Sequence, residues 1–192
     1  MDIKFVFALL SIVLLVGYYP YLRDIFRRQT KPHIYTWLVW AITQGTATAA
    51  LWYGGGNFAV LGLVGGTILV VFIFLLCFKY GTKNITKADT VTLIAALSAI
   101  VVWWQLDNPY LAVAMVSIID GLGYIPTFRK SYEEPWSETI SFWVAMSASS
   151  LFGILASGEY NFLTVTYLAT LATANAVVAI ICISRREIST KR

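Results

Sequence analysis

The amino-acid sequence predicts an all-α integral membrane protein with seven transmembrane helices. Of its 192 residues, 58% are hydrophobic and only 12% are charged, with a mean hydropathy of +0.72. A soluble domain of this size needs far more polar surface. The apolar residues form runs that are long enough to cross the ~30 Å hydrocarbon layer of a bilayer. These runs cover residues 3–22, 33–53, 57–78, 88–106, 109–128, 137–156 and 160–184.

The first run, residues 3–22, also has the apolar character of a signal peptide. It lacks a cleavage site made of small residues, and a similar segment at 107–128 is internal to the chain. We therefore interpret it as the first membrane helix. The connections between the runs are short, which leaves no room for a separate soluble domain.

The basic residues predict the orientation of these helices. All of them except Lys4 lie in three alternate connections and in the tail after the last run. The other connections, "YGGGN", "LDNP" and "SGEYN", carry no basic residue. Because basic loops stay cytoplasmic, the N-terminus is predicted outside and the C-terminus inside, in a plasma or bacterial inner membrane. The formal net charge of +4 reflects this bias and some attraction to anionic lipids, and it does not indicate a nucleic-acid partner.

A repeat divides the chain into two halves. The stretch "GYYPYLR" at 17–23 returns as "GYIPTFR" at 123–129, and the same offset of 106 pairs other uncommon residues, such as Trp37 with Trp143. Two three-helix units, 1–80 and 108–192, are therefore predicted, with a linker helix within 81–107. One intervening helix gives both units the same orientation, so two parallel three-helix bundles are expected around an axis along the membrane normal.

This 3+1+3 plan, with one proline near the cytoplasmic end of each unit's first helix, resembles the SWEET sugar transporters and the related PQ-loop proteins. The nicotinamide riboside importers are more distant relatives of that group. The resemblance implies transport of a small polar solute by alternating access. The proline–glutamine pair of the PQ-loop proteins is absent, because Pro20 precedes Tyr21 and Pro126 precedes Thr127. This departure leaves the subfamily and the substrate open.

Pro20 and Pro126 each remove one hydrogen bond from their helix and favour a bend. The resemblance implies that both prolines act as hinges of an inner gate. The alternative is that each proline simply marks a helix end before a basic loop.

Asp120 is the one ionisable residue that falls at mid-membrane depth, where such residues are costly and are functional candidates by default. Helical spacing places Ser117, Asp120 and Tyr124 on one face. A desolvated carboxylate in this place could take up and release a proton, which would couple transport to a proton gradient. The alternative is a structural carboxylate that is bonded to neighbouring hydroxyl groups. Its counterpart in the first unit is Leu14, so any proton site is asymmetric.

Polar and aromatic residues at matching depths predict a solute site between the two units. They are Trp37, Gln44 and Thr48 on the second helix, Trp143, Ser147 and Ser150 on the sixth, Tyr124 on the fifth and Asn175 on the seventh. Asn175 resembles the substrate-binding asparagine of the SWEET family. Neutral hydrogen-bonding groups beside aromatic rings suit a sugar or another uncharged polar solute. The same residue types also join membrane helices to one another or form an interfacial aromatic belt.

No motif indicates an enzyme, a metal site or a cofactor, so none is expected. Cys77 and Cys182 show no pairing pattern, and His33 is expected at the inner headgroup level. Three alternatives stay open: transport of amino acids or nucleosides, a non-transporting receptor or solute-binding protein of the same fold, and a lipid-handling protein. The expected partners are a small polar solute and membrane lipids, and assembly into a homo-oligomer is left open.

Overall fold

The computed structural model describes residues 3–53, 59–103, 105, 108–157 and 160–190, without some side chains near helix ends. This part of the chain is all-helical and contains no strand, with 87% of residues in seven helical rods. The first rod is continuous through α1 (Ile3–Val13), the 3-10 turn η1 (Leu14–Gly17) and α2 (Tyr18–Phe26). The remaining elements are α3 (Ile34–Tyr53), α4 (Ala59–Tyr80), α5 (Lys87–Trp103), α6 (Pro109–Glu133), the 3-10 turn η2 (Pro135–Ser137), α7 (Ile140–Ala156) and α8 (Phe162–Thr190).

Each predicted apolar run corresponds to one of these rods, but their lengths are unequal. Within the described residues, Ile3–Phe26 and Thr164–Ile188 are long and apolar enough to cross a membrane by length and composition. Val64–Tyr80 and Ile140–Ala156 are shorter apolar helices. The helical architecture is therefore as predicted, whereas seven membrane crossings remain a proposal.

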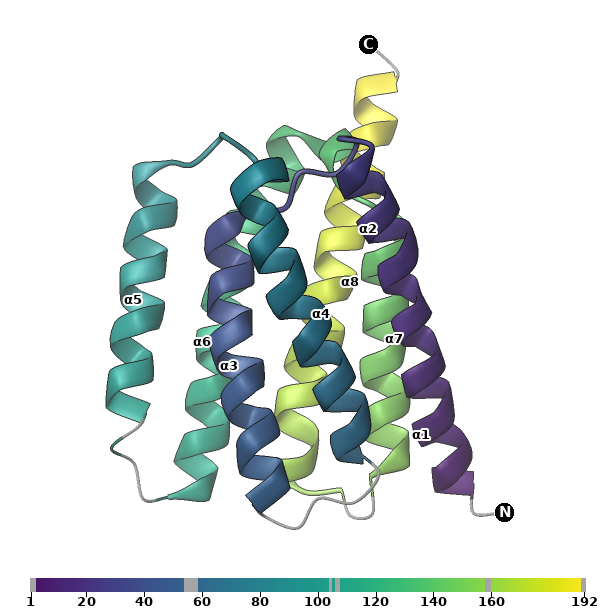
Figure 1. Ribbon diagram of the computed structural model, residues 1–192, viewed down its shortest axis with the longest axis vertical. Coiled ribbons are helices and arrows are strands. Elements are labelled where there is room, and N and C mark those ends of the chain that lie inside the picture. The colour runs from purple at the N-terminus through teal and green to yellow at the C-terminus, as the bar shows by residue number, and fades with distance from the viewer. Residues whose placement is uncertain (1–2, 54–58, 104, 106–107, 158–159, 191–192) are drawn as a thin grey trace.

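Six of the seven rods form a closed ring. The rod α1–α2 packs between α7 and α4, α4 packs on α3, and α3 packs on α6. Helix α8 then joins α6 to α7 and completes the ring. Helix α5 lies beside the ring, against α6 and the edge of α3, and the N- and C-termini lie at opposite ends of the bundle (Figure 1).

Two contacts between helices of different units match under the offset of 106. Gly17 faces Ala145 of α7 so closely that a Cβ at position 17 would lie 2.6 Å from the Ala145 Cβ. Gly123 faces Val39 of α3, where an added Cβ would lie 3.1 Å from Val39 Cγ1. Since Ala145 and Val39 are themselves equivalent positions, the first helix of each unit crosses the second helix of the other unit in the same way.

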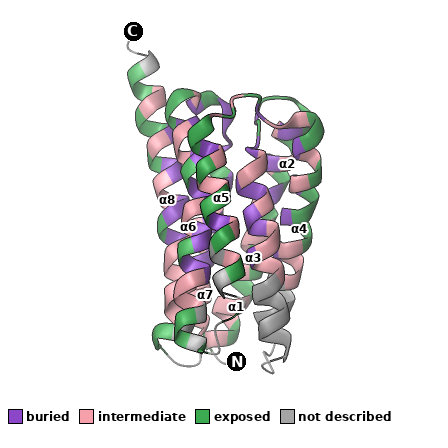
Figure 2. Ribbon diagram, turned by 90° about the vertical axis from the view of Figure 1, so that its left-hand side faces the viewer, coloured by how far each residue is buried: buried purple, intermediate pink, exposed green. Residues whose placement is uncertain are grey.

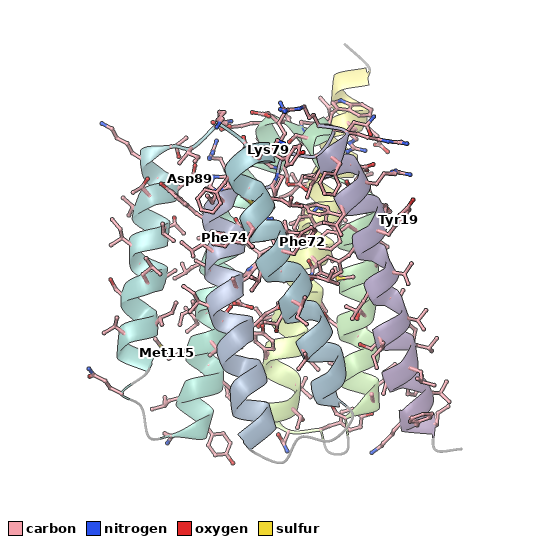
Figure 3. All side chains as sticks on the ribbon, viewed as in Figure 1. Tyr19, Phe72, Phe74, Lys79, Asp89 and Met115 are labelled. Atoms are coloured by element: carbon pink, nitrogen blue, oxygen red, sulfur yellow. The ribbon has the colours of Figure 1, made fainter. Side chains whose placement is uncertain are left out.

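The buried residues gather in the half of the bundle nearer α2 and the C-terminus (Figure 2). We call this end the basic end, because Figure 3 shows many nitrogen-bearing side chains there, including that of Lys79. An aromatic layer fills the core on this side, made by Tyr18, Tyr21, Trp37, Trp40, Tyr124, Phe142 and Trp143. By contrast, the outward-facing side chains of several helices are large and apolar, and Ile68, Val91, Val144 and Ile180 are each more than half exposed.

Both prolines lie within helices. Pro20 is in α2, which continues to Phe26, and Pro126 is inside α6, which continues to Glu133. The backbone around them differs, because the 3-10 turn η1 comes immediately before α2, whereas α6 stays α-helical through its proline. A tighter turn is one way in which a helix accommodates the carbonyl that a proline leaves without its usual partner.

Candidate functional site

Polar side chains from α3, α6 and α8 meet inside the ring. We call Thr43, Asp120, Tyr124, Tyr167 and Asn175 the central polar cluster. Four of its members are at least 95% buried, and the hydroxyl oxygen of the fifth, Tyr167, is buried too. The cluster lies beside the aromatic layer, since the Trp40 ring packs on Tyr124 with the ring centroids 4.4 Å apart.

Asp120 has no exposed surface, and only one of its carboxylate oxygens is paired. Its Oδ1 is hydrogen-bonded to the Thr43 hydroxyl, while its Oδ2 has no hydrogen-bond partner among the described residues. The Tyr167 hydroxyl lies near enough to interact with this carboxylate, but it does not reach hydrogen-bond geometry. None of the ion pairs in the described part of the chain involves Asp120.

The Thr43 hydroxyl has one hydrogen but three neighbouring oxygens, so its bonding depends on whether Asp120 is protonated. The Thr43 hydroxyl oxygen lies 3.1 Å from the Val39 carbonyl oxygen and 3.4 Å from that of Trp40, in addition to its contact with Asp120. A threonine hydroxyl carries a single hydrogen and can also accept. If Thr43 donates to its own helix, the Asp120 carboxyl must carry the proton of the shared bond. If the carboxyl is ionised, Thr43 must turn its hydrogen towards it.

Tyr124 and Asn175 form a second bonded pair in the cluster. The Tyr124 hydroxyl donates to Asn175 Oδ1 over 3.0 Å, and Asn175 Nδ2 donates to the Leu171 carbonyl over 2.8 Å. The buried indole nitrogen of Trp40, packed on Tyr124, has no hydrogen-bond partner among the described residues. An unpaired buried donor is costly, so a solute that accepts from Trp40 would gain affinity there.

The other predicted site residues lie outside the central polar cluster. Trp37 and Trp143 belong to the closely packed aromatic layer and are each 1% exposed. Ser147 donates to the Ala172 carbonyl over 2.8 Å and Ser150 to the Met146 carbonyl over 3.0 Å, so both hydroxyl hydrogens serve the helix backbone. The Gln44 side-chain oxygen lies beside Gly66 on α4, and the Thr48 side chain is outside the described residues.

Sequence reasoning missed a set of buried charges at the basic end. It assigned Arg129 and Lys130 to a loop, but α6 continues past both of them. Arg129 pairs with Asp89 on α5 at 2.7 Å, and Lys130 pairs with Glu138 just before α7. A usable signal was present, because Arg129 closes the repeated "GYIPTFR" stretch and an acidic residue, Glu138, lies at the start of the sixth apolar run.

His33 belongs to the same end, in the loop before α3, and is fully buried. Its Nε2 lies 3.4 Å from Asp89 Oδ2. Burial lowers the pKa of His33 to about 4, because the charged imidazolium would lose its hydration, and the attraction of Asp89 only partly offsets this. His33 is therefore neutral at pH 7, so its contact with Asp89 is not an ion pair.

No family model, curated protein or solved structure matches this chain. The geometry of the central polar cluster and of the basic end therefore carries the functional argument.

Proposed function

We propose that this protein is a membrane transporter that moves a small polar solute by alternating access between its two three-helix units. Sugars are the first class to test, followed by amino acids and nucleosides. In this proposal all seven rods cross the membrane, with the basic end in the cytoplasm and the N-terminus outside.

Two properties of the surface support a membrane setting. Large apolar side chains point outward from helices on different sides of the bundle, and lipid tails would cover them. All basic residues that the structure describes, except Lys4, lie in the loops or in the helix ends at the basic end, as the positive-inside rule requires.

The central polar cluster supports transport and, in particular, proton coupling. Asp120 is buried at mid-helix without an ion-pair partner, and its bond to Thr43 has one arrangement for each protonation state. An ionised carboxylate in this place is costly unless a cation neutralises it, so proton binding would change the energy of the closed ring. This is the observation on which the proposal mainly rests. Asp120 is then the proton-coupling residue, and Tyr124, Asn175 and Trp40 offer polar groups to the solute.

The aromatic layer closes the proposed site on its cytoplasmic side. Trp37, Trp143 and Tyr21 are almost completely buried between the cluster and the basic end. A solute would have to displace this layer to leave towards the cytoplasm. Pro20 and Pro126, which lie within the helices that flank the layer, are the proposed hinges of this movement.

Uptake into proteoliposomes tests the proposal. Labelled hexoses, disaccharides, neutral amino acids and nucleosides would be offered with and without a pH gradient, to wild type and to Asp120→Asn. We expect saturable uptake of one class that the gradient accelerates in wild type and leaves unchanged in Asp120→Asn. Glu133→Gln is the matched control, because it converts an exposed carboxylate of the same helix to an amide and should keep the response to the gradient.

The other outcomes have definite meanings. Saturable uptake that ignores both the gradient and the substitution would keep the transporter and assign Asp120 to structure. No uptake by folded protein would reject transport and favour a solute-binding receptor of the same fold.

A further inference from the structure

Two oppositely charged side chains are buried against each other at the basic end. Lys130 has no exposed surface and Glu138 is 3% exposed, and the Lys130 ammonium is hydrogen-bonded to Glu138 Oε1. Buried charges persist only where a partner and further hydrogen bonds compensate for lost hydration. The remaining contacts of this pair therefore show what it holds together.

The Lys130 ammonium joins the two units. Besides Glu138, it donates to the carbonyl of Lys31 over 2.5 Å and reaches the carbonyl of Ser137 at 3.5 Å. Lys31 lies in the α2–α3 loop of the first unit, while Ser137 and Glu138 belong to the second. The Lys31 amide also donates to the Ser137 carbonyl over 3.1 Å. All three ammonium hydrogens are thus directed at the seam where the connecting segments of both units meet.

The pair is also connected to the aromatic layer. The second carboxylate oxygen of Glu138 accepts a hydrogen bond from Trp143 Nε1 over 3.0 Å. The Trp143 ring in turn lies 6.0 Å from that of Tyr21 and 6.3 Å from that of Tyr124, measured between ring centroids. A change at the ion pair would therefore change the position of an indole that packs on the central polar cluster.

We propose that Lys130 and Glu138 form a latch that holds the basic ends of the two units together, and that Trp143 links this latch to the aromatic layer. Opening the bundle at its basic end then requires the ammonium to leave the Lys31 carbonyl of the opposite unit. This inference rests on the proposed transporter for the role of the opening, but the latch itself can be tested without any solute.

The chain contains its own reporters of such an opening. It has two cysteines, Cys77 on α4 and Cys182 on α8, and these are 5% and 0% exposed. Both thiols lie close enough to Lys130 and Glu138 to interact with their charges. They lie on the third helix of each unit, and because both are buried we expect a thiol reagent to reach them faster when this end opens.

The experiment measures the rate at which a small maleimide labels the two cysteines of the detergent-solubilised protein. The test variant is the double substitution Lys130→Met with Glu138→Gln, which leaves no unpaired buried charge and keeps an acceptor for Trp143. We expect labelling to become about tenfold faster or more, because the open population increases. Glu133→Gln is the control, since it breaks the ion pair of Glu133 with Arg129 within α6 and should label at the wild-type rate.

Folding is checked in parallel by size-exclusion profile and thermal unfolding, and unfolded protein gives the rate for fully accessible thiols. If the double variant does not fold, Lys130→Gln with Glu138→Gln replaces it, because amides keep hydrogen-bonding groups at both positions.

Wild-type labelling rates in a folded variant without the ion pair would overturn the latch. An equal acceleration in Glu133→Gln would overturn it too, since the effect would then belong to any charge change on α6. Uptake measurements are separate, so a failed latch and a failed transporter give different results.

Discussion

The two helix crossings that correspond under the repeat are built alike but bonded differently. At the α1–α7 crossing, Ser11 and Ser149 bond to each other and to each other's backbone carbonyls, over 2.8 to 3.1 Å. At the α6–α3 crossing, position 43 corresponds to 149, and Thr43 bonds instead to Asp120. At the first crossing both serine hydroxyls have hydrogen-bond partners, whereas at the second Asp120 Oδ2 has no partner among the described residues. Matched contacts thus form the scaffold, and the mismatch marks the candidate site.

The largest effect is expected at the basic end, where His33 corresponds to Thr139. Burial lowers the pKa of folded His33 to about 4, against about 6.5 in an unfolded chain. Between these values the unfolded chain binds a proton that the folded protein does not, so stability falls as the pH drops from 6.5 to 4. The loss amounts to about 3 kcal/mol.

Thermal unfolding midpoints at pH 7 and pH 4.5 measure this loss. Since Asp89, Arg129 and Lys130 face the imidazole and stay in place, the comparison is between wild type and His33→Thr, which introduces the residue of the equivalent position. The variant should lose clearly less stability on acidification. An equal loss in both proteins would show that the pKa of His33 is not lowered in the folded protein.

The next effect concerns the close approach at the glycines. Gly17→Ala places a methyl group 2.6 Å from the rigid Cβ of Ala145, and such overpacking costs about 2 kcal/mol. The second substitution Ala145→Gly should restore most of the lost unfolding midpoint. Gly123→Ala should cost less than about 1 kcal/mol, since the added Cβ would lie 3.1 Å from Val39 Cγ1 and 3.2 Å from Trp40 Nε1, so these neighbours need to move only slightly, and alanine favours the helix. Equal costs at both glycines would contradict the crossing geometry.

The smallest expected effect on stability is at the two equivalent hydroxyl residues, Ser149 and Thr43. Ser149→Ala removes its mutual bonds with Ser11 and should cost about 1 kcal/mol of stability while leaving the response of uptake to pH unchanged. Thr43→Val should have a similar cost, but it removes the bonded partner of Asp120 and should shift the pH at which uptake is half-maximal. The pH profile of uptake measures this difference, and identical profiles would remove Thr43 from the proposed proton site.

Much of the helical plan was predictable because apolar run length and the repeat are strong signals. Each predicted run matches a rod, and Asp120 was recognised as the ionisable residue at depth and is fully buried. The bonding of individual polar residues was not predictable. Ser147 and Ser150 share a predicted stripe with Trp143, yet their hydroxyls bond to backbone carbonyls, because helical spacing gives the face of a residue and not its rotamer.

Lys130 shows a second limit of sequence reasoning. A lysine two positions beyond an apolar run is usually in water, so the run predicted a loop. Its burial depends on Glu138, which lies eight residues later and beyond the short turn η2. No local pattern encodes a pairing across such a turn, and only the packing of α6 against the loops of both units creates it.

The bond between Lys31 and Ser137 has a consequence for how such a bundle can be assembled. These positions correspond under the offset of 106, so a point where they touch lies close to the axis that relates the two units. In a dimer made of two identical units, any charge near that axis would meet its own copy and be repelled. In this chain, positions 24 and 130 are equivalent under the same offset, and they carry Asp24 and Lys130. Joining the units in one chain lets opposite charges occupy them, a solution that a dimer of identical subunits cannot reach.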